Sequence, residues 1–109
     1  MQIWGTGNEI RSFIYIKDIV AAILQAVKLQ NSIGPVNLVS NHKITISELV
    51  NKLITVSGKT TTIEMMPAIT AGRDLIFDNS KMKQYLLSNE TLLDVGLKEE
   101  WEYMKASTI

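Results

Sequence analysis

The most informative stretch of this chain lies near its start and reads Trp4-Gly5-Thr6-Gly7-Asn8-Glu9-Ile10-Arg11-Ser12-Phe13-Ile14-Tyr15-Ile16-Lys17-Asp18. Its two glycines and asparagine accept positive φ at little cost, so they predict a tight hairpin connection between residues 1–4 and a β-rich run over 10–16. Asp18 is a residue type that caps helices, and the apolar periodicity after it predicts a helix. Arg11 is therefore a cation at the mouth of a strand-to-helix unit, a position that suits phosphate binding.

Helix and strand signals alternate after this stretch. A first helix is predicted from about Lys17 to Gln30, ended by Gly34 and Pro35. The apolar run Val36–Ser40 is short and bounded by turn-forming residues, which favours a buried strand. This order of strand, helix and strand predicts a parallel pair joined by a right-handed crossover.

A second helix is predicted by a capping box. Thr45 accepts from the third backbone N–H, Glu48 reaches back to the cap, and Gly58 marks the end of the helix. The β-branched run Thr60–Met66 predicts another strand. Two further helices are predicted from cap residues, one from Asp78 to about Leu87 and one from Thr91 toward Lys105.

These elements predict a single α/β domain over residues 1–109. It is expected to be a small three-layer-like unit that combines an N-terminal hairpin, parallel strands and about four helices. Eleven basic and eleven acidic residues leave no net charge, which argues against a nucleic-acid partner. The absence of cysteine fits a reducing cytoplasm, and no apolar run approaches the ~18 residues of a membrane span.

The opening stretch resembles a segment of the extended short-chain dehydrogenase/reductases, the NAD-dependent nucleotide-sugar epimerases and dehydratases. The paired glycines, Arg11, the aromatic residues and Asp18 follow in the order of that family's carboxy-terminal half. By this resemblance, the arginine at Arg11 contacts the diphosphate of a nucleotide sugar, and the aspartate at Asp18 opens the following helix. Many members have an acidic residue after that arginine, where this chain has Ser12.

The resemblance continues along nearly the whole chain. The family's order is matched by the later segments Gly34–Ser40, Thr45 as a helix cap, Asp78–Lys81, and a closing helix with Gly96 and Trp101. The resemblance thus implies the C-terminal part of a Rossmann-type enzyme, namely its substrate-binding portion. A nucleotide-diphosphate sugar and the missing N-terminal NAD-binding Rossmann portion are the implied partners.

Two motifs of such enzymes are absent from the sequence. Gly5-Thr6-Gly7 lacks a third glycine at the opening of a helix, which a dinucleotide fingerprint requires, because strand-like residues follow it. No tyrosine is followed by a lysine four residues later, so the family's proton-transfer pair is missing. We therefore expect no cofactor and no catalytic residue in this chain, with NAD or NADP in the parent enzyme.

Arg11 and Arg73 are the two predicted substrate-binding residues. A guanidinium grips phosphate oxygens through paired, charge-assisted hydrogen bonds. The alternative for Arg11 is a surface or salt-bridged arginine on a strand. The alternative for Arg73 is an ordinary loop arginine, because many relatives place an Arg-Pro-Gly-Asp run earlier, where this chain has Ile69 and Thr70. His42 has no metal-ligating neighbour at suitable spacing.

Two functional hypotheses follow. In the first, the chain is the substrate-binding portion of an NAD(P)-dependent nucleotide-sugar epimerase, dehydratase or reductase and is inactive alone. In the second, it is a stand-alone, non-enzymatic α/β module that binds a nucleotide or a protein. The unpaired strand edges of a substrate-binding portion taken alone predict self-association.

Overall fold

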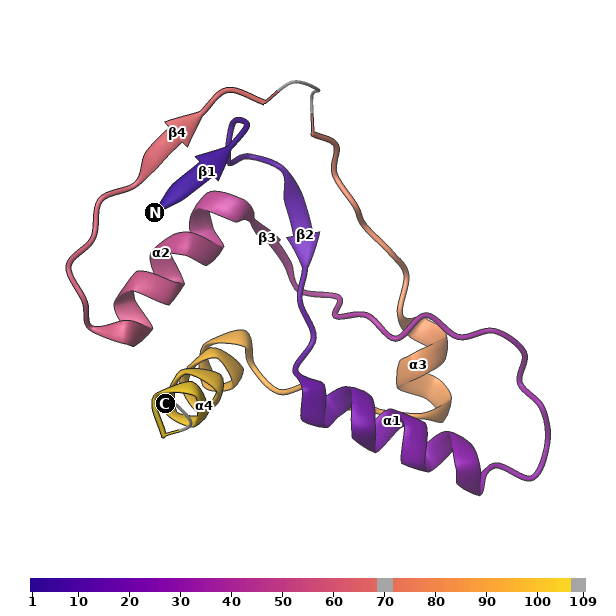
Figure 1. The fold of residues 1–109 in the computed structure, drawn as a ribbon. Coiled ribbons are helices and arrows are strands. Elements are labelled where there is room, and N and C mark those ends of the chain that lie inside the picture. The colour runs from indigo at the N-terminus through magenta and orange to yellow at the C-terminus, as the bar shows by residue number, and fades with distance from the viewer. Residues whose placement is uncertain (69–71, 107–109) are drawn as a thin grey trace.

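The computed structural model describes residues 1–68 and 72–106, which form short strands and longer helices (Figure 1). The strands are β1 (Gln2–Trp4), β2 (Ile10–Ser12), β3 (Lys43–Thr45) and β4 (Glu64–Met66). The helices are α1 (Ile16–Lys28), α2 (Ile46–Ser57), α3 (Ser80–Tyr85) and α4 (Leu93–Ala106). The predicted α/β class is confirmed, as are the helices expected near residues 78–87 and 91–105.

Each strand pairs with a segment that is distant in sequence, and β1 does not pair with β2. β1 runs parallel to β4, and β2 runs antiparallel to β3, in two separate two-stranded sheets. The predicted hairpin between residues 1–4 and 10–16 is therefore wrong. Gly5 and Gly7 do have positive φ, at 102° and 77°, but their turn carries the chain from one sheet to the other. The glycines determine the backbone conformation of the turn, but they do not determine which strands pair. β1 pairs with β4, and Ile3 of β1 is only 4% exposed.

α2 begins and ends as the sequence predicts. Thr45 Oγ1 accepts the Glu48 backbone N–H at 3.1 Å, which satisfies one of the free amides of the first turn. The Glu48 carboxylate reaches back to the Thr45 hydroxyl, 3.2 Å away. Gly58 ends the helix with a left-handed φ of 66°. The predicted Thr45 cap and glycine stop are thus confirmed, whereas Glu48 accepts from the cap's hydroxyl and not from its backbone N–H.

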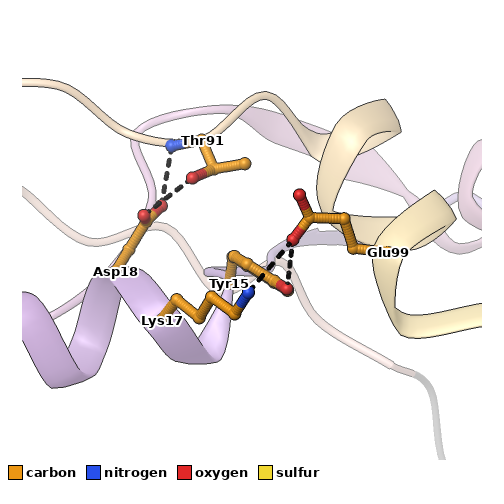
Figure 2. A network of polar contacts seen from close by, with 5 residues as sticks. All are labelled: Tyr15, Lys17, Asp18, Thr91 and Glu99. Atoms are coloured by element: carbon orange, nitrogen blue, oxygen red, sulfur yellow. Dashed lines mark hydrogen bonds and ion pairs between the residues drawn. The ribbon is translucent and has the colours of Figure 1, made fainter. Parts of the chain in front are cut away.

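α1 covers most of the helix predicted over 17–30, but its predicted cap is wrong. The N-cap is Tyr15, whose backbone carbonyl accepts the Asp18 N–H at 3.0 Å, and no side chain caps the helix. The Asp18 side chain turns inward and accepts the Thr91 N–H at 2.7 Å and the Thr91 hydroxyl at 2.8 Å (Figure 2). A buried carboxylate needs such donors, and the turn before α4 offers two.

A second contact joins the same two helices. The Tyr15 hydroxyl donates to Glu99 Oε2 of α4 at 2.5 Å, and Lys17 Nζ lies 3.7 Å from the same oxygen (Figure 2). The hydrogen bond to the Glu99 carboxylate raises the pKa of Tyr15 to about 12. The Tyr15 ring also lies over Gly96, where a Cβ atom would be only 3.2 Å from the ring. Polar contacts and close packing thus fix the start of α1 against α4.

The predicted strand over Val36–Ser40 is wrong, because that segment pairs with no strand among the described residues. Side chains contact it instead. Asn79 Nδ2 donates to the Val39 carbonyl at 3.1 Å and to Glu90 Oε1 at 3.0 Å. The Ser40 hydroxyl donates to Glu90 Oε2 at 3.0 Å. These bonds hold one side of the segment against the loops before α3 and α4.

The buried core is small and distributed over several elements. Its apolar members are Ile3, Ala22, Ile44, Val50 and Met82. Figure 1 shows the elements spread along an arc rather than gathered around one centre. Within residues 1–68 and 72–106, no helix combines the length and the apolar character that crossing a membrane requires.

Candidate functional site

The candidate site is built around β2, which has a strand on one edge and a loop on the other. Arg11 of β2 is opposite Ile44 of β3 in the antiparallel pair. On the other edge, the Ile10 N–H donates to Asp74 Oδ1 at 2.9 Å, and the Ile10 carbonyl accepts the Leu75 N–H at 3.0 Å. The segment 73–75 that follows β4 is therefore fixed alongside β2.

The Arg11 side chain is half-buried and reinforces this arrangement. Its Nη1 donates to the Ile10 carbonyl at 2.8 Å and to the Arg73 carbonyl. The two predicted site residues, 62 positions apart in sequence, thus lie in direct contact. A guanidinium has five N–H donors, and those on Nε and Nη2 have no partner among the described residues. Arg11 also forms no ion pair with any carboxylate of that part of the chain.

Arg73 contributes in a different way from Arg11. Its backbone carbonyl accepts the bond from Arg11, while its side chain is exposed and contacts no polar group of residues 1–68 and 72–106. The rest of the predicted loop, including Ile69 and Thr70, lies outside the described residues. The structure thus holds the Arg11 guanidinium against two backbone carbonyls and leaves the Arg73 side chain exposed.

An acidic hollow lies on one side of this pair. It has a volume of about 640 Å³, and its lining includes Glu9, Gly72 and Asp74. The Glu9 side chain lies close to Gly5 and Gly72, where added Cβ atoms would come within 2.8 Å and 2.6 Å of it. Hydrogen bonds from its own backbone N–H, and then from Thr6, lower the pKa of Glu9. Because the described residues that line it include two carboxylates and no cation, this hollow is better suited to sugar hydroxyl groups than to phosphate.

A second hollow, of about 410 Å³, lies near the other end of β2. Its lining includes Ser12, Asn41, Lys43 and Asp78. Ser12 and Lys43 are opposite each other in the β2–β3 pair and so share a face, whereas Arg11 is on the other face. Hydrogen bonds from Ser80 lower the pKa of Asp78. Neither hollow is lined by Arg11 or Arg73.

Sequence reasoning missed Lys43 and Asn41. Asn41 lies in the polar loop before β3, next to His42, whereas Lys43 is the first residue of β3. The alternation of Lys43, buried Ile44 and Thr45 was the available signal, because it is the period-two pattern of a short strand.

No cluster of metal-ligating side chains occurs in the part of the chain that the structure describes. The turn at Gly5–Gly7 leads into β2 and not into a helix, so it has no helix N-terminus to receive a cofactor pyrophosphate. The residues present at this turn therefore do not fit a dinucleotide cofactor, and we assign no step to one in this chain.

Comparison with known proteins identifies a family model and relatives whose sequences are similar to this chain. Residues 1–39, which include Arg11, match the model of the NAD dependent epimerase/dehydratase family. A dTDP-4-dehydro-6-deoxy-D-allose reductase from a Streptomyces species is 27% identical over 100 residues, covering 91% of this chain and 30% of that protein. A probable GDP-L-fucose synthase from Oryza sativa subsp. japonica is 26% identical, covering 98% of this chain and 33% of that protein. The chain therefore spans roughly a third of the length of these relatives.

Solved structures resemble the chain over nearly its full length. The UDP-glucuronic acid 4-epimerase from Bacillus cereus, in complex with UDP-glucuronic acid and NAD, matches with a TM-score of 0.81 and 27% identity. That match covers 96% of this chain and 35% of the epimerase. The UDP-glucose 4-epimerase from Thermotoga maritima with UDP-glucose matches with a TM-score of 0.85 and 26% identity over 100% of this chain and 36% of its own. The chain thus has the fold of one third of these enzymes.

Proposed function

We propose that this chain is the substrate-binding portion of an NAD(P)-dependent nucleotide-sugar epimerase, dehydratase or reductase. Its ligand is a nucleotide-diphosphate sugar, and its role is to hold the diphosphate and so position the sugar for chemistry carried out elsewhere in the enzyme. The observation that carries this proposal is the similarity, over nearly the whole chain, to epimerases whose structures contain nucleotide sugars.

Arg11 is the principal diphosphate contact in this proposal. Its Nη1 is engaged by two carbonyls, which orients the guanidinium and leaves three N–H donors for phosphate oxygens. Because the Arg73 backbone is held by Arg11, the Arg73 side chain begins beside it and adds a second cation. The acidic hollow near Glu9 accepts the hydroxyl groups of the ligand, since ionised carboxylates repel its phosphates.

Binding energy from the diphosphate contributes to catalysis only through positioning. A substrate held at a remote group reaches the reacting geometry with less loss of freedom at the moment of reaction. When bound elsewhere in the parent enzyme, a nicotinamide cofactor supplies the hydride chemistry. We propose that the chain alone binds its ligand weakly and turns none over.

Titration calorimetry with UDP and dTDP tests the proposal. We expect Arg11→Ala to weaken diphosphate binding by about tenfold or more, because a charge-assisted hydrogen bond is worth about 1.5–3 kcal/mol. Arg11→Lys keeps the charge but loses the planar fork, so it restores only part of the affinity. Arg73→Ala has a smaller effect, since its side chain has to turn to reach the ligand.

Lys28→Ala is the matched control. It removes the same charge at the far end of α1, and it leaves binding unchanged if the effect of Arg11 is local. Circular dichroism of each variant separates lost binding from lost folding. Equal affinity of the wild type and a folded Arg11→Ala variant contradicts the proposed clamp.

A further inference from the structure

The first part of the connection between β4 and α3 is held against β2. Figure 1 shows the described part of this connection as an extended ribbon without helix or strand. Of the described residues that follow β4, the first to form hydrogen bonds are those of the segment 73–75, and their partners are Ile10 and Arg11. The place of this segment beside β2 therefore depends on three bonds to two residues.

Asp74 forms one of these bonds with its side chain. Its Oδ1 accepts the Ile10 N–H at 2.9 Å, while the N–H of the next residue, Leu75, donates to the Ile10 carbonyl at 3.0 Å. A neighbouring strand would engage the two polar groups of Ile10 in the same way, but with a backbone carbonyl as the acceptor. The Asp74 carboxylate thus takes the place of a strand partner on this edge of β2.

The segment that Asp74 anchors also supplies an acceptor for the Arg11 guanidinium. Arg11 Nη1 donates to the Ile10 carbonyl at 2.8 Å and to the Arg73 carbonyl. The first acceptor belongs to β2 itself, whereas the second directly precedes Asp74 in the anchored segment. If that segment moves away from β2, the guanidinium loses one of the two carbonyls that orient it and gains freedom to rotate.

The charge of the Asp74 carboxylate is unfavourable for an anion site. The carboxylate binds the residue that precedes Arg11, and it lines the acidic hollow beside the two arginines. Like charges repel, so Asp74 opposes a bound diphosphate by its charge. Within residues 1–68 and 72–106 it forms no ion pair with Arg11 or Arg73, and its bond to Ile10 is its one hydrogen bond. That bond is the means by which Asp74 can favour anion binding.

We propose that Asp74 is a positioning residue for the Arg11 guanidinium. It accepts the Ile10 N–H, this bond keeps the segment 73–75 alongside β2, and the Arg73 carbonyl then orients the guanidinium toward the diphosphate. This inference rests on the proposed function, because it assigns how the chain orients the arginine that the diphosphate clamp requires. Its consequence is opposite in sign to the electrostatic one, since removal of a negative charge weakens the binding of an anion.

Inorganic pyrophosphate is the probe for this role, because it carries the charge of a diphosphate and has no hydroxyl groups of a sugar for the acidic hollow. Titration of the full chain, followed by nuclear magnetic resonance, measures its dissociation constant. We expect Asp74→Ala to weaken binding about three- to tenfold, because the guanidinium then has to be ordered on binding. Asp74→Asn keeps an oxygen that accepts the Ile10 N–H, so it binds pyrophosphate at least as tightly as the wild type.

Two results of this titration overturn the proposal. One is an Asp74→Ala variant that binds pyrophosphate as tightly as the wild type or more tightly, as expected if the carboxylate acts only by its charge. The other is equal weakening in Asp74→Ala and Asp74→Asn. Asp94→Ala is the matched control, since it removes an exposed aspartate of α4 that pairs with Lys52, and it leaves the dissociation constant unchanged.

A double-mutant cycle tests whether Asp74 acts through Arg11. In the Arg11→Ala background, Asp74→Ala should no longer weaken pyrophosphate binding, because there is no guanidinium left to orient. Losses that add in the double variant overturn the proposal. Circular dichroism shows that each variant keeps its helices.

The side-chain nitrogen signals of Arg11 give a readout that needs no ligand. Two carbonyl acceptors on Nη1 slow the rotation of the guanidinium about its Nε–Cζ bond, so we expect this rotation to be several-fold faster in Asp74→Ala and unchanged in Asp74→Asn. Equal rotation in Asp74→Ala and the wild type overturns the proposal.

The two proposals fail in different ways. If Arg11→Ala binds pyrophosphate as the wild type does, the diphosphate clamp is wrong, and the rotation rates still decide whether Asp74 orients Arg11. If Arg11→Ala weakens binding and Asp74→Ala does not, the clamp stands and the positioning role of Asp74 is wrong.

Discussion

Replacing Asp18 is expected to separate α1 from α4. The Asp18 carboxylate is buried and takes both donors of Thr91, the backbone N–H at 2.7 Å and the hydroxyl at 2.8 Å. Asp18→Ala removes both bonds and leaves a partly buried Thr91 N–H without a partner. Figure 2 shows that these bonds lie beside the Tyr15–Glu99 contact, so the loss weakens the whole junction between the helices.

The magnitude follows from the two bonds. Hydrogen bonds to charged groups contribute about 1.5–3 kcal/mol each, but two bonds to one carboxylate are not additive, so we expect Asp18→Ala to cost about 3 kcal/mol. Thr91→Val removes the hydroxyl bond alone and is expected to cost about 1.5 kcal/mol. A negative charge in the first turn of a helix adds about 0.3–1 kcal/mol through the helix dipole, and Asp18→Ala loses this as well.

Urea unfolding of the two single variants and the double variant measures these terms. Far-ultraviolet circular dichroism follows the loss of the helices as the urea concentration rises. In the Asp18→Ala background, Thr91→Val should change the free energy of unfolding very little, because the partner of the Thr91 hydroxyl has already been removed. The contribution of the helix dipole cancels in this double-mutant cycle. A free energy of unfolding for Asp18→Ala within about 0.5 kcal/mol of the wild type refutes the reasoning.

Three further predictions concern single contacts. Thr45→Ala should lower the free energy of unfolding by about 1 kcal/mol through loss of the α2 cap, measured as a shift of the urea midpoint at constant slope. Gly58→Ala should also cost about 1 kcal/mol, and since nothing lies within 4 Å of the added Cβ, its thermal midpoint reports the left-handed backbone alone. Tyr15 should titrate near its raised pKa of about 12, seen as the difference in absorbance at alkaline pH between the wild type and Tyr15→Phe, and Glu99→Gln should lower that pKa. Because the folded pKa lies above that of the unfolded chain, the stabilisation by this bond is complete below pH ~10 and is lost as the pH rises toward 12.

The parts of the fold that the sequence predicts correctly are those specified by neighbouring residues. The Thr45 cap and the left-handed Gly58 each act within one turn of helix, so the local sequence predicts their geometry. The hairpin fails because its turn residues fix a reversal of backbone direction but not the strand that lies alongside. Strand partners depend on contacts across the whole chain, here between residues 1–5 and 62–66.

The candidate site likewise combines residues that the sequence predicts with contacts that it does not predict. The sequence predicts that Arg11 and Arg73 are cations with access to solvent. It does not predict their contact, because that contact depends on the segment 73–75 lying along β2 and no local pattern encodes this arrangement. Asp18 resembles a cap because an aspartate near a helix start often is one. Its contact with Thr91 was not predictable from spacing, since the two residues are 73 positions apart.

The α1 stripe, which consists of the exposed apolar residues Ile16, Val20, Ile23, Leu24 and Val27, has a physical cause for its outward position within this chain. Burying the stripe by turning α1 about its axis would gain about 1.5–3 kcal/mol for each large apolar side chain, which is more than the Asp18–Thr91 bonds supply. The helix nevertheless presents Ala22 inward with no exposed area, and a larger side chain forced into a fully buried site costs about 1–3 kcal/mol through overpacking. The small residue and the buried carboxylate therefore select the face of α1 that turns inward and leave the larger apolar face of the helix exposed.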